Sequence, residues 1–280
     1  MIDAQVNTIP LWLLQLFKSP VNLTICLLLS CPNTQMAVGV LALQGSFNEH
    51  IAALRRIGAR GVEIRKAEQL QNVTSLIIPG GESTTMAKLA ELNNLFPALR
   101  EFVKMGKPVW GTCAGLIFLA DRATGQKIGG QELIGGLDCT VHRNFFGSQI
   151  QSFEAELLVP EIVVKEGGPP SFRAVFIRAP AILEVGPEVE VLADVPYPSD
   201  KNVSQEPEDA EVPKKAIVAV RQRNILATAF HPELTADTRW HSYFLKMTAE
   251  VDNEASSSII IPYGGHQSYE QPKIDLPVYQ

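Results

Sequence analysis

Cysteine is scarce in this chain of 280 residues, which contains only four: Cys26, Cys31, Cys113 and Cys139. Their spacing is too irregular for a disulfide framework, and no Cys-x-x-Cys pair accompanied by histidines indicates zinc. We therefore expect free thiols, no bound metal and a reducing compartment, which makes the cytoplasm the expected location.

The chain also lacks an excess of positive charge and lacks long apolar runs. The formal net charge of −6 gives no reason to expect nucleic acid as a partner. The apolar runs at 11–17 and 21–29 are each shorter than the roughly 20 residues of a membrane-spanning helix, so we expect no stable membrane insertion. No lysine or arginine precedes Leu11, where a signal peptide would carry its basic region. We interpret residues 1–35 as an extension outside the fold, with a cleaved or anchoring segment as the alternative.

The rest of the chain has the composition of a protein with a sizeable core, at 46% hydrophobic and 19% charged residues. In its first half, β-prone runs alternate with helical patterns. The predicted strands are 37–43, 62–64, 75–78 and the run before Cys113, and the predicted helices are 47–57, 83 onward and 96–105. Such alternation favours right-handed βαβ units and an α/β fold with a doubly wound, mainly parallel sheet flanked by helices. Sites in such folds lie at the carboxyl ends of the strands.

The second half contains short strands joined by turns, which predicts an antiparallel extension of the sheet. These strands are 153–159, 174–177, 189–193, 217–221 and 225–230. A closing helix at 238–250 places Trp240, Phe244 and Met247 on one face. We therefore predict one domain at 36–250, with a polar, mobile surface loop at 194–215 and a disordered tail at 251–280.

Cys113 is the first candidate for chemistry. It lies where a β-prone run meets an apolar helical run, and Gly111 and Gly115 flank it at two residues on either side. This pattern is typical of a nucleophile elbow, in which a tight strand-to-helix turn exposes the central side chain. The helix N-terminus favours a thiolate there. The alternative is a buried structural cysteine beside a turn.

A cysteine nucleophile needs a base, and the chain has five histidines. Three of them are most simply surface residues: His50, His241 and His266. His142 is harder to dismiss because it neighbours Arg143 and Asn144. His231 is different, because it follows a β-prone run and precedes Pro232, which holds it in an extended conformation.

In an extended segment, residues two apart point to the same side, so the Glu233 carboxylate can approach the His231 imidazole and orient it. The pattern predicts a triad of Cys113, His231 and Glu233. The alternative is a strand-ending turn with an incidental acid. For the oxyanion we expect the backbone N–H groups of Gly81, in the glycine-rich turn after residue 78, and of Ala114. Ser83 and Thr84 are predicted to cap the following helix.

Three motifs together resemble class I glutamine amidotransferases, which have a flavodoxin-like fold: the elbow at 111–115, the segment 79–85 and the triplet 231–233. Further motifs resemble, more closely, the glutaminase subunit of pyridoxal 5′-phosphate synthase, in its plant version. These are 41–45 with Glu49 and His50, 80–86, 143–147 and 176–180. The resemblance covers about residues 36–250.

The resemblance implies that Cys113 attacks the side-chain amide of L-glutamine, with His231 as base and then acid and Glu233 orienting it. A γ-glutamyl thioester forms, ammonia leaves and water releases glutamate, with no cofactor. The family implies glutamine-binding residues at Gly81, Glu82, Ser83, Arg143, Ile177 and Arg178. Guanidinium groups suit the α-carboxylate of an amino acid.

The resemblance also implies a partner, a barrel-shaped synthase subunit that receives the ammonia through an internal path and on which full glutaminase activity depends. The chain departs from the bacterial pattern at Ser148, where arginine is usual, in the longer loop 194–215 and in both extended termini. Three alternatives remain open: a glutaminase serving another synthase, such as the one that makes imidazole glycerol phosphate, a non-catalytic glutamine-binding module, and a stand-alone thiol hydrolase of γ-glutamyl compounds.

Overall fold

A computed structural model describes residues 37–125, 130–146, 152–196 and 215–256. The chain divides into two units, Met1–Gln35 and Met36–Gln280, and every described residue belongs to the second. The predicted extension at 1–35, Ser148, residues 197–214 of the predicted loop and residues 257–280 of the predicted tail lie outside the described residues. Among the helices of the described residues, none combines the length and the apolar character needed to span a membrane.

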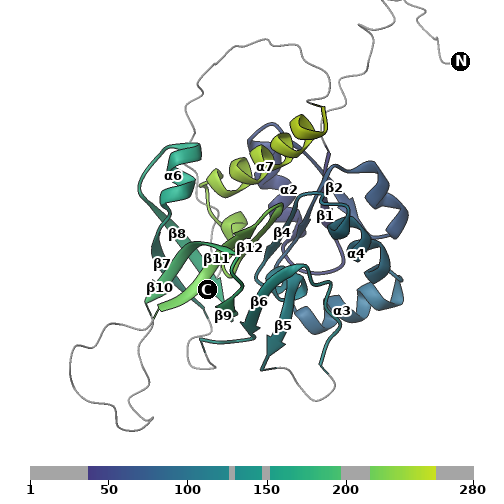
Figure 1. The fold of residues 1–280 in the computed structure, drawn as a ribbon, viewed down its shortest axis with the longest axis horizontal. Coiled ribbons are helices and arrows are strands. Elements are labelled where there is room, and N and C mark those ends of the chain that lie inside the picture. Colours follow the sequence, from purple (N-terminus) through teal and green to yellow (C-terminus); the bar gives the residue numbers. More distant parts are fainter. Residues whose placement is uncertain (1–36, 126–129, 147–151, 197–214, 257–280) are drawn as a thin grey trace, which may run out of the picture. The chain divides into compact units, whose positions relative to one another are not determined.

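A ten-stranded mixed sheet forms the centre of the domain, in the order β2-β1-β3-β4-β12-β11-β9-β6-β5, with β10 paired to β11 beside that path (Figure 1). Its strands are β1 (Ala37–Leu41), β2 (Arg60–Ile64), β3 (Ser75–Ile78), β4 (Val109–Thr112), β5 (Ala120–Thr124), β6 (Leu137–His142), β9 (Ala181–Val185), β10 (Glu190–Pro196), β11 (Lys215–Gln222) and β12 (Ile225–Thr228). β5, β6 and β9 were absent from the sequence prediction, because short runs with charged residues, such as those of β5, carry little β-signal.

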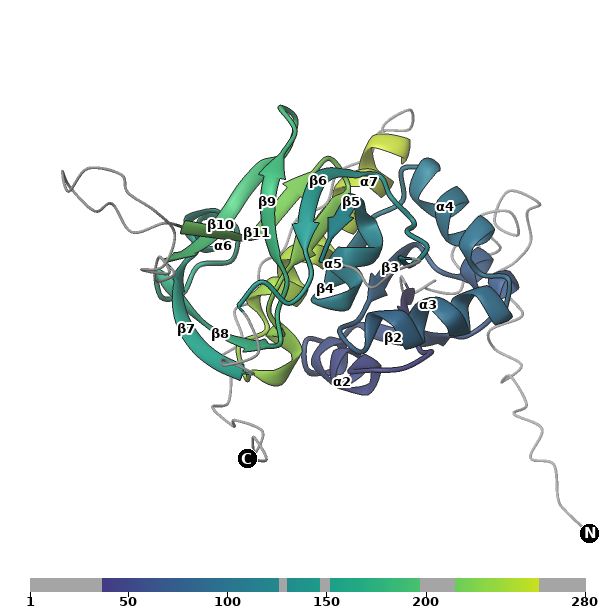
Figure 2. The same cartoon turned by 90° about the horizontal axis from the view of Figure 1, so that it is seen from below.

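The predicted parallel direction is confirmed for β2, β1, β3 and β4, and the predicted antiparallel extension is confirmed by the pairing of β11, β9 and β6. β12, predicted in the antiparallel extension, pairs antiparallel with β11 on one side but parallel with β4 on the other, and β5 pairs parallel with β6. A second part of the prediction was wrong. β7 (Ser152–Leu158) and β8 (Ser171–Ile177) pair with each other in a separate two-stranded sheet and do not extend the main one. Figure 2 shows this ribbon beside β10 and α6, with α3 and α4 across the main sheet.

Helices cover both faces of the sheet. α2 (Phe47–Arg56) and α7 (Arg239–Ser256) pack on one face, where Trp110 of β4 contacts rings from both helices. The opposite face carries α5 (Ala114–Leu119), against which α3 (Ser83–Leu92) and α4 (Phe96–Lys104) pack. α6 (Pro160–Glu166) lies against α7, and the short 3₁₀ helices are η2 (Ala67–Asn72) and η3 (Pro232–Leu234).

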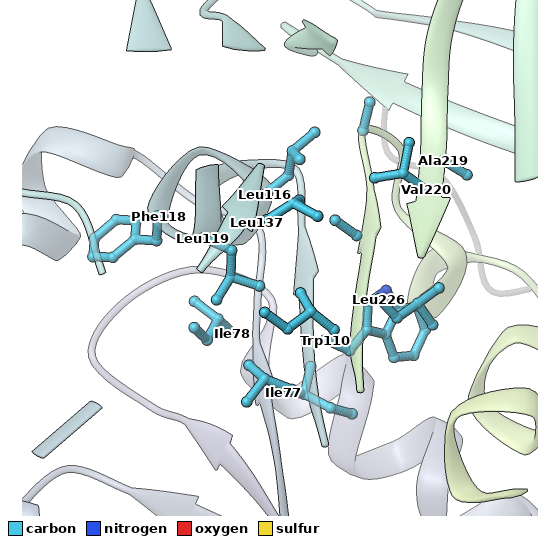
Figure 3. Close-up of a cluster of buried hydrophobic side chains, with 14 of the residues drawn as sticks. Ile77, Ile78, Trp110, Leu116, Phe118, Leu119, Leu137, Ala219, Val220 and Leu226 are labelled. Atoms are coloured by element: carbon cyan, nitrogen blue, oxygen red, sulfur yellow. The ribbon is translucent and has the colours of Figure 1, made fainter. Parts of the chain in front are cut away.

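The core lies along the central strands. Figure 3 shows Ile77, Trp110 and Leu226, which come from three adjacent strands and stand at paired positions of the sheet. The predicted apolar face of α7 is confirmed, since Trp240, Phe244 and Met247 are buried.

Two boundaries differ from the sequence prediction. α7 continues to Ser256, beyond the predicted end at 250. β10 extends to Pro196 and β11 starts at Lys215, so residues 194–196 and 215, predicted as loop, belong to paired strands. The main-chain pairing between these two strands outweighs the polar composition of their ends.

Candidate active site

The turn between β4 and α5 holds Cys113 in a strained conformation. Its φ of 47° and ψ of −99° are unusual for a residue other than glycine. The Cys113 N–H donates to the Thr228 carbonyl at 2.8 Å, which ties the turn to β12. A Cβ at Gly111 would overlap the Gly115 carbonyl, and one at Gly115 would overlap the Ile78 carbonyl. The flanking glycines therefore allow the close packing that an elbow needs, as the sequence predicted.

His231 and Glu233 form the predicted pair directly after β12. The His231 Nδ1–H donates to Glu233 Oε1 at 2.7 Å, and the His231 backbone N–H donates to the Val175 carbonyl at 2.9 Å. The Ser46 hydroxyl also donates to Glu233 Oε1, at 2.6 Å. Sequence reasoning missed Ser46, because nothing in the chain links residues 187 positions apart.

The pKa values of this pair favour a charged imidazole. Burial alone would lower the pKa of His231, but the Glu233 carboxylate and the Cys113 sulfur raise it well above its usual value. Burial alone would raise the pKa of Glu233, but His50, His231 and the hydrogen bonds from His231 and Ser46 lower it to about 2. An imidazolium beside Cys113 suits a thiolate nucleophile.

Cys113 and His231 line a cavity of about 310 Å³. This volume lies at the lower end of the range found for small-molecule binding sites. The predicted site residues that line it are Gly81, Glu82, Ser83, Cys113, Ala114, Arg143, Ile177, Arg178 and His231. Glu233 is fully buried behind His231. The structure thus brings all the predicted site residues together. It adds four that sequence reasoning did not assign: Gln44, Ile117, Asn144 and Pro180.

Both predicted oxyanion donors line the same cavity as Cys113. Ala114 is the first residue of α5, so its N–H has no acceptor within the helix. Gly81 follows Gly80, where a Cβ would overlap Cε1 of His231 and lie 3.2 Å from Cβ of Cys113. The turn after β3 can approach the nucleophile this closely only because it has no side chains there.

The model of the SNO glutamine amidotransferase family matches residues 40–250. The chain belongs to this family. It is 71% identical over 255 residues to the probable pyridoxal 5′-phosphate synthase subunit PDX2 of Arabidopsis thaliana, covering 88% of this chain and 100% of the relative. It is 49% identical over 221 residues to the pyridoxal 5′-phosphate synthase subunit PdxT of Acidothermus cellulolyticus, covering 79% and 98%. A crystal structure of a glutamine amidotransferase superposes with a TM-score of 0.62 at 43% identity, covering 76% of this chain and 98% of the other.

The capping of α3 in this amidotransferase differs from the sequence prediction. Glu82 is the N-cap, and its carboxylate accepts from the N–H groups of Thr84 at 3.2 Å and Thr85 at 2.6 Å. The predicted caps, Ser83 and Thr84, instead present their hydroxyls to Arg143 Nη2 at 2.6 and 3.1 Å. The Glu82 carboxylate can accept hydrogen bonds from two N–H groups, and the positive end of the helix dipole stabilises its negative charge. This explains why Glu82, rather than Ser83 or Thr84, caps α3.

The prediction that His50 and His241 are surface residues was wrong. Both are fully buried, on α2 and α7 respectively, and both lie behind Glu233. A signal for this was present in the sequence. His50 stands three residues after Phe47 and four before Leu54, and His241 stands three before Phe244, so each falls on the apolar face of its helix.

Proposed function

We propose that this amidotransferase is the glutaminase subunit of a pyridoxal 5′-phosphate synthase. It hydrolyses L-glutamine to L-glutamate and ammonia, and a separate synthase subunit uses the ammonia. The observation that carries the proposal is the strained Cys113, which lines the same cavity as Arg143 and the His231 of the His231–Glu233 pair. The names of the PDX2 and PdxT relatives support the choice of synthase.

In the first half-reaction, the Cys113 thiolate attacks the side-chain amide carbon of glutamine. The carbonyl π electrons move to oxygen, and the N–H groups of Gly81 and Ala114 stabilise that negative charge. His231, protonated by the thiol, donates its proton to the amide nitrogen as the C–N bond breaks. Ammonia leaves and a γ-glutamyl thioester remains on Cys113.

In the second half-reaction, neutral His231 takes a proton from water, whose oxygen attacks the thioester carbon. The C–S bond breaks, glutamate leaves and the thiolate–imidazolium pair returns. Glu233 keeps Nδ1 of His231 protonated throughout, so that Nε2 exchanges the proton with sulfur, nitrogen and water.

We assign substrate recognition to Glu82, Ser83, Ile177 and Arg178, all at the cavity, together with Arg143. The Ile177 carbonyl lies 3.9 Å from the Cys113 sulfur, so the β8 end borders the position of the reacting amide. Arg143 suits the α-carboxylate because a guanidinium donates two parallel hydrogen bonds to it. Ser83 and Thr84 hold Nη2 of Arg143 in place before substrate arrives.

Replacing Arg143 by glutamine is expected to raise KM for glutamine by about 10- to 100-fold, with a smaller change in kcat. A charge-assisted hydrogen bond contributes about 1.5–3 kcal/mol to binding, which corresponds to that range. Steady-state glutamate release measures both constants. The matched control is Arg173→Gln, since Arg173 pairs with Glu154 on the β7–β8 ribbon and does not line the cavity. An unchanged KM in R143Q would remove Arg143 from the substrate site.

The partner assignment is tested by adding a barrel-type synthase subunit to the purified chain. We expect slow glutamate release from the free chain and a clear increase when the synthase subunit is present, with no release from C113A in either case. Glutaminase activity that is full without a partner would instead indicate a stand-alone hydrolase. We also propose a cytoplasmic location, because the reaction needs Cys113 as a free thiol.

A further inference from the structure

Two imidazoles lie behind Glu233, and none of the catalytic steps above uses them. His50 and His241 come from α2 and α7 and are both fully buried. Nε2 of His50 is 3.3 Å from Oε2 of Glu233, and Nδ1 of His50 is 3.0 Å from Nε2 of His241. Trp110 packs edge-on against both rings, with centroid separations of 5.5 and 4.9 Å. The two histidines thus extend the catalytic side chains into the core.

The two oxygens of Glu233 have different surroundings. Oε1 accepts hydrogen bonds from His231 Nδ1 and from the Ser46 hydroxyl. Oε2 is buried, has no hydrogen bond in the described part of the chain, and faces His50 Nε2. A buried ionised carboxylate needs a donor on each side, so His50 is placed where that donor is required.

The contact of His50 with Glu233 favours one set of tautomers. Burial lowers the pKa of His50 and, further, that of His241, so both rings are neutral near pH 7 and each has one donor and one acceptor nitrogen. A lone pair on Nε2 of His50 would repel Glu233, which favours the proton on Nε2. This nitrogen hydrogen-bonds with Thr112 Oγ1 at 3.2 Å and lies 3.3 Å from Oε2 of Glu233. Nδ1 of His50 then accepts from Nε2–H of His241.

The same tautomers also explain the surroundings of Nδ1 of His241. Nδ1 of His241 is buried and has no hydrogen-bond partner in the described structure. With the proton on Nε2, the unpartnered atom is a lone pair rather than a stranded N–H, which is the less costly of the two.

We propose that His50 is a positioning residue for the glutaminase reaction, and that His241 fixes its tautomer. The close contact of His50 Nε2 with Oε2 of Glu233, at 3.3 Å, restricts rotation of the carboxylate and keeps Oε1 directed at Nδ1 of His231. The catalytic side chains then form a continuous series from Cys113 through His231, Glu233 and His50 to His241. This inference rests on the proposed function, because a positioning role needs a reaction to position for.

The test compares His50→Ala with His50→Gln, each assayed together with the synthase subunit. Alanine removes the donor to Glu233, whereas the glutamine amide can place an N–H near the position of Nε2. We expect H50A to lower kcat by about 10- to 100-fold, the usual cost of a misoriented catalytic group, while KM changes by less than about twofold. We expect H50Q to recover most of the loss.

Phe244→Leu is the matched control for lost stability, because Phe244 packs on the same tryptophan but does not contact Glu233. Thermal unfolding of each variant sets an assay temperature well below its midpoint, and F244L should keep the wild-type kcat there. An unchanged kcat in H50A, or an H50Q variant as slow as H50A, would overturn the proposal.

Two further measurements keep the result interpretable. Nitrogen-15 NMR of histidine-labelled wild-type chain should show His50 neutral with its proton on Nε2, and the opposite tautomer would overturn the proposal even if H50A did not fold. Labelling of Cys113 by a glutamine-analogue electrophile tests the proposed function separately. If wild-type protein is not labelled, that function fails; if it is labelled as fast in H50A as in wild type, only the role of His50 fails.

Discussion

Replacing Cys113 by alanine is expected to lower kcat for glutamine hydrolysis by about 10⁶-fold, the cost seen when a triad nucleophile is removed. Among the residues that line the cavity, Cys113 alone has a thiol that can form the thioester, so the loss should reach background. Binding of glutamine should change little, because Arg143 and the Gly81 turn do not depend on the sulfur. Glutamate release measures the first effect, and calorimetric titration in the presence of the synthase subunit measures the second.

Cys139 provides a matched control for this experiment. It is fully buried on β6, and burial raises the pKa of its thiol to about 12, with smaller contributions from nearby charges. A thiol with this pKa stays protonated and does not react with electrophiles. C139A should therefore retain both activity and labelling by a glutamine-analogue electrophile, whereas C113A should lose both. Persistent labelling of C113A in the same assay would assign the nucleophile elsewhere.

The second large effect is expected at Gly80, where alanine should reduce kcat/KM by about 100-fold or more. The added Cβ would overlap the His231 ring and press against Cys113, and misplacing a catalytic group by about 1 Å costs roughly that factor. The His231–Glu233 hydrogen bond would be displaced together with the ring. Steady-state kinetics and the rate of Cys113 labelling should fall together.

Gly58→Ala is the control, because it makes the same chemical change at the end of α2. Gly58 has a φ of +76°, and no atom lies within 4 Å of a Cβ built there. The variant should lose about 1–2 kcal/mol of stability from the left-handed conformation and keep its activity. A fully active G80A variant would contradict this prediction. It would show that the His231 ring can move and still function, so that the packing of the Gly80 turn against His231 is unimportant.

The sequence predicted the parts of the site that depend on short spacings. Gly111 and Gly115 mark the elbow around Cys113, and the two-residue step from His231 to Glu233 follows from extended backbone. Arg143 and Arg178 were available only through the resemblance to the amidotransferases, because nothing local distinguishes an arginine in a cavity from one on the surface.

The parts that the sequence did not reveal depend on contacts between distant segments. Ser46 and His50 reach Glu233 only after α2 has packed beside η3, and no local pattern reports that packing. The same holds for the β7–β8 ribbon. Alternating apolar residues predict that a strand exists, but not which strand it pairs with.

The strand order implies that the surroundings of Cys113 are completed late in folding. β12 is the last strand of the described residues, yet it lies between β4 and β11, and its Thr228 carbonyl accepts from the N–H of Cys113. During synthesis, β4 emerges from the ribosome long before β12, so the elbow at first has neither its anchoring strand nor His231. In a partly synthesised chain Cys113 therefore lacks both its backbone acceptor and His231, and these contacts form only when β12 has entered the sheet between β4 and β11.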